Sequence, residues 1–321
     1  MRKLVKVLLG IVIVLGLFWA VINIIPPYKV IENNPFRKGE TTLISAHRGG
    51  SILNPENTEK AFDYVILETS YTDIVEIDVQ TTKDGELVII HDDTINDTGI
   101  NENTPSDDVK IKDTDYKDLL KYNLGVNFED RNGNHPYRDY DIERAEAEGL
   151  TIMRLEDFLI KYNQARDFKL YLEIKEDNEE GKLALEKSIK LLNKYSWWKN
   201  RTMIISFSTA VVEYVPEVDK DMLVGALGYK IAPELVCGLL CLDSLVSAKY
   251  HGFQTSTTNS LGPITVNCAT KRMVKMAHKR NQSITYWTIN DEDTMKHLID
   301  IDVDVITTDC PDVLAKILCK I

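Results

Sequence analysis

The sequence lacks a concentrated basic segment and lacks the cysteine spacings of a metal or disulfide framework. Its 38 Lys and Arg are outnumbered by 50 Asp and Glu, for a net charge of −12. Nucleic-acid binding needs a concentrated basic surface, so this balance argues against a nucleic-acid partner. The five cysteines are odd in number and show no C-x-x-C spacing, which predicts neither a zinc site nor a disulfide framework. No internal repeat or low-complexity tract is present.

One long apolar run, Val7–Ile25, follows three basic residues at the N-terminus and precedes two prolines. Its nineteen uncharged residues would span roughly 28 Å as a helix, close to the hydrocarbon thickness of a bilayer. A cleaved signal peptide, the alternative, usually has a shorter apolar region and an A-x-A-like site, and neither is evident. We therefore expect residues 1–27 to form a cytoplasmic tip and a single-pass transmembrane anchor, with the rest of the chain outside the cytoplasm.

Strand-like and helix-like segments alternate along the rest of the chain, after a linker over residues 28–40. Helix-like stretches with three- and four-residue apolar spacing lie between most strand-like runs, for example at Leu155–Ala165 and Lys182–Tyr195. This alternation implies parallel strands and predicts one (β/α)8 TIM barrel over residues 41–321. The eight strand-like runs are Thr42–His47, Ile74–Val79, Lys169–Lys175, Met203–Phe207, Met222–Leu227, Leu242–Ser247, Ser283–Thr288 and Asp304–Thr307.

Two features follow the second of these runs. The segment Leu87–His91 comes directly after a turn at Lys83-Asp84-Gly85, and so short a link allows only an antiparallel hairpin, which returns His91 toward Asp78. Residues 93–149 then hold fifteen acidic and seven basic residues. We expect a polar, solvated insertion over about residues 93–150 after the second strand.

Charged residues occupy alternate positions on strands that otherwise resemble core elements. Because successive side chains of a strand point to opposite faces, Glu76 shares one face with Asp78, and Glu173 shares one with Lys175. For a single pair, an edge strand with its acidic face in water is the simpler interpretation. A third strand ends in His47, however, and TIM barrels place their chemistry at the carboxyl ends of the strands. The pattern therefore favours a functional site.

Three converging carboxylates, from Glu76, Asp78 and Glu173, would repel one another without a cation. They form an all-oxygen set with no cysteine or histidine spacing, which suits one hard divalent ion, Mg²⁺ or Ca²⁺. Arg48 and Lys175 add positive charge around the same mouth. A divalent ion beside Arg and Lys is suited to binding a phosphate oxyanion.

At this point the sequence resembles the glycerophosphodiester phosphodiesterase family over nearly the whole chain after the anchor. Each matching motif is short, but their order and the E-x-D-V…T-K-D-G…H-D core make the resemblance specific. The matching segments are HRGG at His47–Gly50, PENTEKAF at Pro55–Phe62, EIDVQTTKDGELVIIHD at Glu76–Asp92, LEDFL at Leu155–Leu159, EIK at Glu173–Lys175, ISF at Ile205–Phe207, WTIN at Trp287–Asn290 and ITTDCP at Ile306–Pro311.

The resemblance implies a metal-dependent hydrolase that cuts a glycerophosphodiester into glycerol 3-phosphate and an alcohol, on a TIM barrel. Histidines can supply the acid and the base for this reaction at neutral pH. By this resemblance the metal ligands are Glu76, Asp78 and Glu173, the acid–base pair is His47 and His91, and the phosphate contacts are Arg48 and Lys175.

Four further residues have two interpretations each. Glu56 and Asn57 match an active-site loop of the family, but they could equally cap the helix that follows. Phe207 and Trp287 could form an apolar wall for the glycerol carbons, although aromatic residues on barrel strands more often belong to the core. The four other histidines match no motif and are interpreted as surface or structural residues.

The sequence departs from the family pattern in two places, and two rival functions stay open. Asn96-Asp97-Thr98-Gly99 lacks the usual arginine, which puts the contacts of a substrate loop in doubt, and Met153-Arg154 replaces Pro-Thr. One rival is phospholipase-D-like hydrolysis of lysophospholipids at a membrane surface. The other is a catalytically silent, membrane-tethered binding protein, against which the intact set of carboxylates and histidines argues. The sequence leaves the oligomeric state open.

Overall fold

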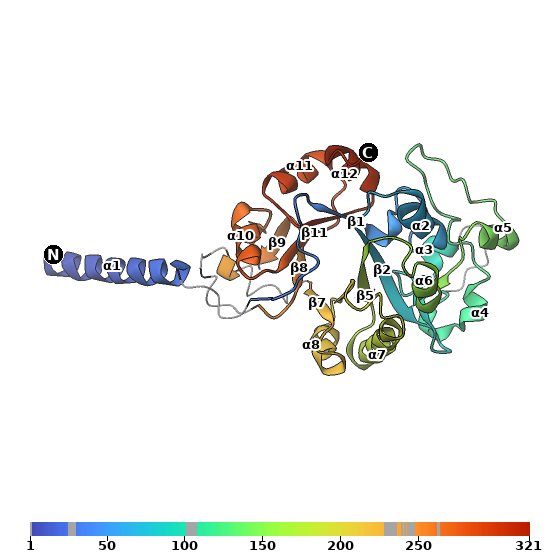
Figure 1. Ribbon diagram of the computed structural model, residues 1–321, viewed down its shortest axis with the longest axis horizontal. Helices are drawn as coiled ribbons and strands as arrows, with labels where there is room; N and C mark the ends of the chain where they lie inside the picture. The colour runs from blue at the N-terminus through green and yellow to red at the C-terminus, as the bar shows by residue number, and fades with distance from the viewer. Residues whose placement is uncertain are drawn as a thin grey trace.

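The computed structural model of the chain describes residues 2–24, 30–100, 108–227, 236–238, 240, 242, 248–261 and 264–321. Eight parallel strands form a closed barrel surrounded by helices, and a separate apolar helix forms the N-terminus (Figure 1). The predicted TIM barrel is confirmed. Its strands are β1 (Leu43–Ala46), β2 (Ile74–Thr81), β5 (Lys169–Ile174), β6 (Thr202–Ile205), β7 (Leu223–Ala226), β8 (Gly252–Thr255), β11 (Ser283–Tyr286) and β12 (Val305–Thr308).

Pairing between β1 and β2 closes the sheet, and seven of the predicted runs overlap barrel strands. The remaining strand is β8, which the sequence pattern did not predict. The run predicted instead, Leu242–Ser247, lies outside the described residues apart from Leu242. In β8 only Phe253 carries a large apolar side chain, and Gly252 packs so closely on β11 that an added Cβ would lie 2.4 Å from Ser283 Oγ. Contact between strands therefore determines this element more than local hydrophobicity does.

The helices cover the outside of the barrel and bury the larger of its hydrophobic layers. Outward-facing strand residues such as Ile77 and Leu172 pack there against helix residues such as Leu185 and Leu192. The surrounding helices are α2 (Glu59–Asp63), α6 (Leu155–Lys161), α7 (Asn178–Lys194), α8 (Thr209–Val218), α10 (Lys271–Lys279), α11 (Glu292–Asp300) and α12 (Pro311–Ile317). A hairpin of β9 (Thr258–Leu261) and β10 (Ile264–Asn267) lies between β8 and α10.

The barrel interior is filled from its N-terminal end by a residue that precedes β1. Phe36 is fully buried and stacks on Tyr171 with ring centroids 5.0 Å apart. It belongs to an interior cluster with inward-facing strand residues, including Ile74, Met203 and Val305. This apolar plug fills one end of the barrel, and the buried carboxylates of Glu76, Asp78 and Glu173 lie toward the other end.

The strand β2 continues beyond the barrel and carries the insertion. Its end, Val79–Thr81, pairs antiparallel with β3 (Leu87–Ile89), and β4 (Met153–Arg154) extends this small sheet. The predicted hairpin is therefore present. The polar insertion also contains a small buried core of its own, which its composition did not indicate. Its short helices are α3 (Asn96–Gly99), α4 (Tyr116–Leu119) and α5 (Ile142–Ala147).

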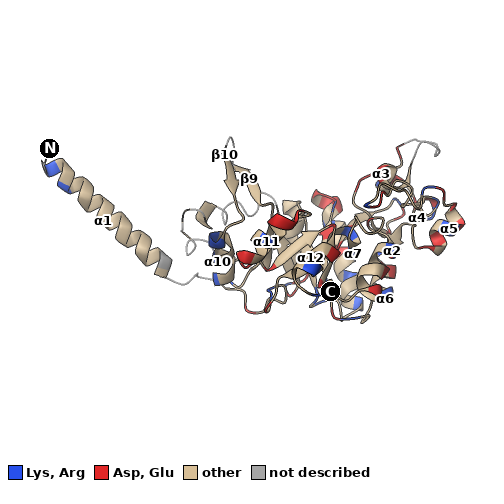
Figure 2. Cartoon of the chain, turned by 90° about the horizontal axis from the view of Figure 1, so that it is seen from above, with Lys and Arg blue, Asp and Glu red and all other residues tan. Residues whose placement is uncertain are grey.

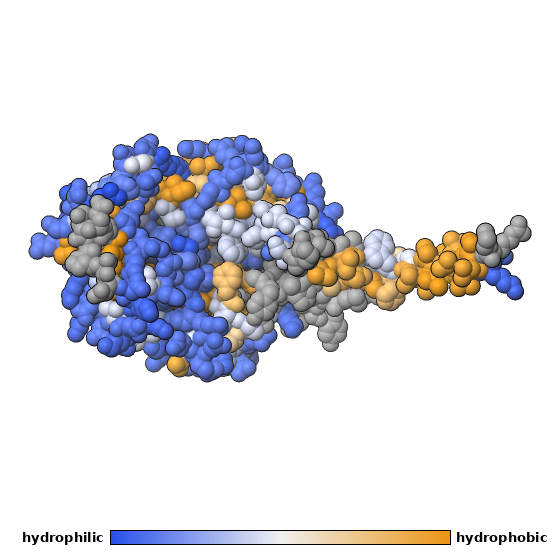
Figure 3. Space-filling view, turned by 180° about the vertical axis from the view of Figure 1, so that it is seen from behind, coloured by the Kyte–Doolittle hydropathy of each residue, from blue (hydrophilic) through white to orange (hydrophobic). Residues whose placement is uncertain are grey.

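The N-terminal helix α1 (Arg2–Ile24) is apolar along most of its length, whereas the face of the barrel shown in Figure 3 is largely hydrophilic. Its segment Lys3–Ile22 has 20 residues and a mean hydropathy of 2.7. The helix is long and apolar enough to cross a membrane, as a signal sequence also is. In Figure 2, acidic and basic residues are interspersed over the rest of the chain, and that view shows no wholly basic face.

Candidate active site

Three buried carboxylates meet at the carboxyl end of the barrel. Glu76 and Asp78 lie on β2 and Glu173 on β5, and the strand register places Asp78 directly beside Glu173. One ligand atom from each residue lies within 4.8 Å of the others. The alternation of each strand explains this convergence, because Ile74 and Tyr171, on the same faces, belong to the barrel interior.

The electrostatics of this triad call for added positive charge. Burial, followed by repulsion from Asp78 and Glu173, raises the pKa of Glu76 to about 8. Burial and Asp78 likewise raise the pKa of Glu173 above its ordinary value. Burial opposes ionisation of Asp78 too, but cationic neighbours, Lys175 first, outweigh it and lower that pKa. Of the three carboxyl groups, Asp78 therefore ionises most readily, and ionisation of Glu76 is disfavoured.

The residues present fit a hard divalent cation. Asp78 Oδ2 accepts a hydrogen bond from Asn57 Nδ2 at 2.9 Å, whereas the buried Asp78 Oδ1 and Asn57 Oδ1 have no hydrogen-bond partner. A buried oxygen without a donor is costly unless a ligand compensates it. Over the part of the chain that the structure describes, this triad is the only group of three or more acidic, histidine or cysteine side chains close enough to share an ion.

Two cations flank the triad. Arg48 lies in a short 3-10 turn after β1 with a φ of 53°, and its backbone N–H donates to Glu76 Oε2 at 2.8 Å. The Arg48 guanidinium lies 3.6 Å from Asp78 Oδ2. From the other side, Lys175 Nζ donates to Glu173 Oε1 at 2.9 Å and lies 3.5 Å from Asp78 Oδ1. Both cations are held where an anion bound over the triad could contact them.

Each predicted acid–base histidine is bound to a carboxylate of its own. His47 Nδ1 lies 2.6 Å from Asp309 Oδ1, and His91 Nδ1 lies 2.6 Å from Asp92 Oδ1. Gln80 Nε2 donates to the backbone carbonyls of His91 and Asp92, at 2.9 and 2.6 Å. Contacts of this kind orient an imidazole ring and leave Nε2 for chemistry.

The network behind His47 contains residues to which the sequence analysis assigned no role. Asp309 also accepts hydrogen bonds from Ser51 Oγ and Asn290 Nδ2, each at 2.6 Å. Burial would raise the pKa of Asp309, but its contacts with His47, Ser51 and Asn290 together outweigh burial and lower that pKa to about 2. For His47, burial alone would lower the pKa, yet Glu76 and Asp309 raise it. Asp309 and Asn290 lie in the motifs ITTDCP and WTIN, so a signal for them existed.

The loop before α2 contacts the site directly. Both oxygens of Glu56 accept from Arg48 Nη1, at 3.0 and 2.9 Å, while Asn57 binds Asp78 as described above. The N-cap of α2 is Thr58, whose side chain accepts from the Ala61 N–H. Glu56 and Asn57 are therefore not the caps of this helix.

The two aromatic residues form a separate wall at the mouth of the barrel. Phe207 follows β6 and Trp287 follows β11, and their rings meet edge to face with centroids 5.7 Å apart. Trp287 is partly buried against the interior cluster, whereas Phe207 is 48% exposed. The wall is thus part core and part surface.

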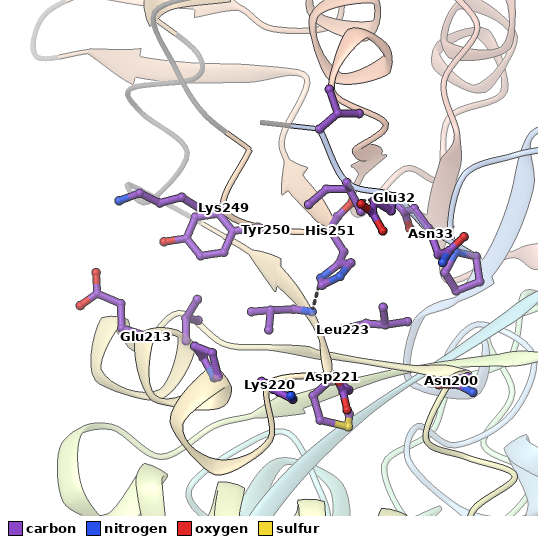
Figure 4. Close-up of a pocket in the computed structure, with 18 residues that line it drawn as sticks. Glu32, Asn33, Asn200, Glu213, Lys220, Asp221, Leu223, Lys249, Tyr250 and His251 are labelled. Atoms are coloured by element: carbon purple, nitrogen blue, oxygen red, sulfur yellow. Dashed lines mark hydrogen bonds between the residues drawn. The ribbon is translucent and has the colours of Figure 1, made fainter. Parts of the chain in front are cut away.

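One further cavity and the four histidines without a predicted catalytic role lie away from the triad. A cavity of about 1260 Å³ opens at the opposite end of the barrel, where His251 Nδ1 accepts from the Val224 N–H at 3.1 Å (Figure 4). It brings together none of the predicted site residues. The remaining histidines contact Phe128 O (His135), Asp304 (His278) and Ala269 O (His297).

Comparisons with known proteins identify the family of this chain. The model of the glycerophosphoryl diester phosphodiesterase family matches residues 47–313. A glycerophosphodiester phosphodiesterase of Caldanaerobacter subterraneus is 29% identical over 87% of this chain and 98% of its own length. A lysophospholipase D of Mus musculus is 23% identical over 86% of this chain and 82% of its own. A phosphodiesterase of Oleispira antarctica, solved with the product sn-glycerol-3-phosphate, superposes with a TM-score of 0.63 at 20% identity, covering 87% and 97%.

Proposed function

Because the chain belongs to the glycerophosphoryl diester phosphodiesterase family, we propose that it hydrolyses glycerophosphodiesters to glycerol 3-phosphate and an alcohol. The observation that carries the proposal is the buried triad of Glu76, Asp78 and Glu173, in which Asp78 Oδ1 has no hydrogen bond while Arg48 and Lys175 flank the same carboxylate. A catalytically silent binding protein would have no need for three buried carboxylates that repel one another.

The triad would hold one divalent cation, Mg²⁺ or Ca²⁺, and that ion would polarise a phosphoryl oxygen of the bound diester. Arg48 and Lys175 would contact the remaining phosphate oxygens and neutralise charge that develops in the transition state. Glu56 fixes the guanidinium of Arg48 for this task. We assign the glycerol carbons to the wall of Phe207 and Trp287.

The two histidines would move the protons. One imidazole takes the proton of the attacking oxygen as its bond to phosphorus forms, and the other protonates the leaving oxygen as the second P–O bond breaks. The attacking group is water, or the glycerol hydroxyl of the substrate in a route through a cyclic phosphate. Electrostatic interactions of His47 with Glu76 and of His91 with Asp78 support this assignment.

We further propose that α1 anchors the protein in a membrane as a single pass. In this proposal residues 1–27 form the cytoplasmic tip and anchor, residues 28–40 connect it to the barrel, and residues 41–321 form the catalytic domain outside the cytoplasm. The apolar segment of 20 residues supports the proposal. The full-length protein should stay in the membrane fraction through alkaline carbonate washing, and a soluble product lacking the segment would show that a signal peptide was cleaved.

A substrate panel tests the proposed reaction. Glycerophosphocholine, glycerophosphoethanolamine and glycerophosphoglycerol should each release glycerol 3-phosphate in the presence of Mg²⁺ or Ca²⁺. Excess EDTA should abolish turnover, and replacing the ion should restore it, because the triad needs a cation to ionise fully. Full activity in EDTA would remove the metal from the proposal.

A second candidate function is hydrolysis of lysophospholipids to a lysophosphatidic acid and an alcohol. Two observations favour it: lysophospholipase D enzymes are among the relatives of this chain, and the apolar helix could hold the barrel at a lipid surface. Adding a lysolipid to the same panel, in detergent and in vesicles, separates the two. A higher kcat/KM for the lysolipid than for every water-soluble diester would favour this candidate.

A further inference from the structure

A second cavity, of about 380 Å³, adjoins the proposed active site on the side of the insertion. It begins at the phosphate-contacting end of the site and extends over the first part of the insertion. We name it the head-group groove. Its lining includes Arg48 and Glu56 from the active site and Asp92, Asp97, Phe128 and Glu129 from the segment that follows the hairpin.

The head-group groove is strongly acidic. Four carboxylates line it, and among the described residues that do so Arg48 is the one cation. The guanidinium of Arg48 is already bound by both oxygens of Glu56. Asp97 and Glu129 are exposed on its outer part, and Glu129 Oε2 lies 3.7 Å from His135 Nε2. The outer part therefore presents negative charge to whatever enters it.

Two buried polar atoms at the inner end of the groove lack hydrogen-bond partners. Arg48 Nε is buried and donates no hydrogen bond, although it lies 3.6 Å from Asp78 Oδ2, and the other oxygen of that carboxylate, Oδ1, is buried without a hydrogen-bond donor. An unpaired buried donor and an unpaired buried acceptor are what a phosphate held with a cation would satisfy. A diester whose phosphate lay against Arg48 would have room for its alcohol in the groove.

The residues that line the groove suit an organic cation better than a second metal ion. Within the described ranges, only the triad brings three metal-ligating groups together, so the carboxylates of the groove are too dispersed to chelate an ion. Phe128 adds an aromatic ring, which attracts an ammonium group through its π face. In choline and ethanolamine the nitrogen lies two carbons from the ester oxygen, a short reach from Arg48.

We propose that the head-group groove makes the enzyme selective for diesters whose alcohol carries a positive charge, as in glycerophosphocholine and glycerophosphoethanolamine. The inference rests on the proposed hydrolysis of glycerophosphodiesters and specifies its substrate class. Asp97 is a chief determinant, and it lies in the segment where the sequence departs from the family pattern. Glu129 and Phe128 supply the second charge and the aromatic face.

The test compares kcat/KM for glycerophosphocholine and for the neutral glycerophosphoglycerol in the full-length enzyme with its metal. The wild type should prefer the cationic substrate, and added salt should reduce that preference. In the double variant Asp97→Asn with Glu129→Gln the ratio should fall by about tenfold, since each exposed charge contributes a factor of about three. Phe128→Leu should lower the ratio by a smaller factor.

A matched control is Glu143→Gln, which removes an exposed acid of the same insertion that does not line the groove. It should leave the ratio unchanged. Equal kcat/KM for both substrates in the wild type, or an unchanged ratio in the double variant, would overturn the inference while leaving the hydrolase intact. Cleavage of no diester at all would instead remove the proposed function, so the two failures are distinguishable.

Discussion

The two ends of the barrel each bury an aspartate completely, and the two aspartates differ in their partners. Asp304, at the N-terminal end of β12, is fully enclosed by donors. Its oxygens accept from Arg37 Nη1 at 2.7 and 2.8 Å, from the Lys38 and Ile284 N–H groups at 3.1 and 2.9 Å, and lie 3.1 Å from His278 Nε2. This carboxylate links the segment before β1 to the barrel.

Asp78, at the carboxyl end of the barrel, is equally buried, but one of its oxygens has no hydrogen bond. It shares its surroundings with two more acids, Glu76 and Glu173, as well as with the cations Arg48 and Lys175, whereas the partners of Asp304 named above are all hydrogen-bond donors. The comparison shows that burial alone does not mark a functional carboxylate. An unused lone pair beside like charges does, because the protein alone cannot stabilise that arrangement.

The largest difference between the two ends should appear in catalysis. Asp78→Asn removes a metal ligand, and we expect kcat/KM to fall by about 10³-fold or more, since several kcal/mol of transition-state stabilisation depend on the bound ion. Asp304→Asn should leave kcat/KM of the folded enzyme within about twofold. Steady-state assays at saturating Mg²⁺ or Ca²⁺ measure both. Comparable losses in the two variants would erase the distinction.

Each end also pairs a histidine with an aspartate, which extends the comparison. His47→Ala and His91→Ala should each reduce turnover by about 10²–10⁴-fold, the usual range for a lost acid or base. His278→Ala, beside Asp304, should leave turnover nearly unchanged. A diester with a nitrophenyl leaving group needs little protonation as it departs, so it should rescue the variant that lacks the acid and not the one that lacks the base. A near-normal rate for either site variant on the natural diester would exclude that histidine from the mechanism.

The Asp304 network at the N-terminal end of the barrel should make a large contribution to the free energy of unfolding. Asp304→Asn leaves Arg37 without its carboxylate and should lower the free energy of unfolding by about 2–3 kcal/mol. Asp302→Asn is the matched control, because Asp302 pairs with Lys38 at 2.6 Å but is 64% exposed, and it should cost less than about 1 kcal/mol. Chemical denaturation of the metal-free protein measures both. Equal costs would mean that the buried network adds nothing beyond a surface ion pair.

The smallest effect concerns pH at the carboxyl end. With the pKa of Glu76 at about 8, a proton competes with the metal below that pH, so apparent affinity for Mg²⁺ or Ca²⁺ should rise by up to about tenfold per pH unit and level off above pH 8. Because this folded pKa is raised above the unfolded one, the metal-free protein should lose stability as pH rises toward 8. Calorimetric titration across this range tests the first effect, and Glu76→Gln should flatten the curve.

The sequence predicted the barrel and the shared faces of its charged residues because both follow from local geometry. The spacing of Glu76 and Asp78 needs only the two-residue repeat of a strand, and the hairpin that returns His91 needs only a short turn. The network around Asp309 escaped prediction because its members lie far apart in the chain. β8 escaped because its packing, with Gly252 against Ser283, leaves little hydrophobic pattern to detect.

The sequence by itself determined which side chains face the barrel interior, since the alternation along each strand depends on backbone geometry alone. Only the tertiary structure decided which buried acids are compensated. Arg37 and Asp304 are 267 positions apart, and His47 and Asp309 are 262 positions apart. These residues meet because closure of the barrel pairs β12 with β1. A local sequence pattern carries no information about that pairing. Pairing of β2 with β5 likewise brings the triad together at the other end, where Asp78 Oδ1 is buried without a hydrogen bond.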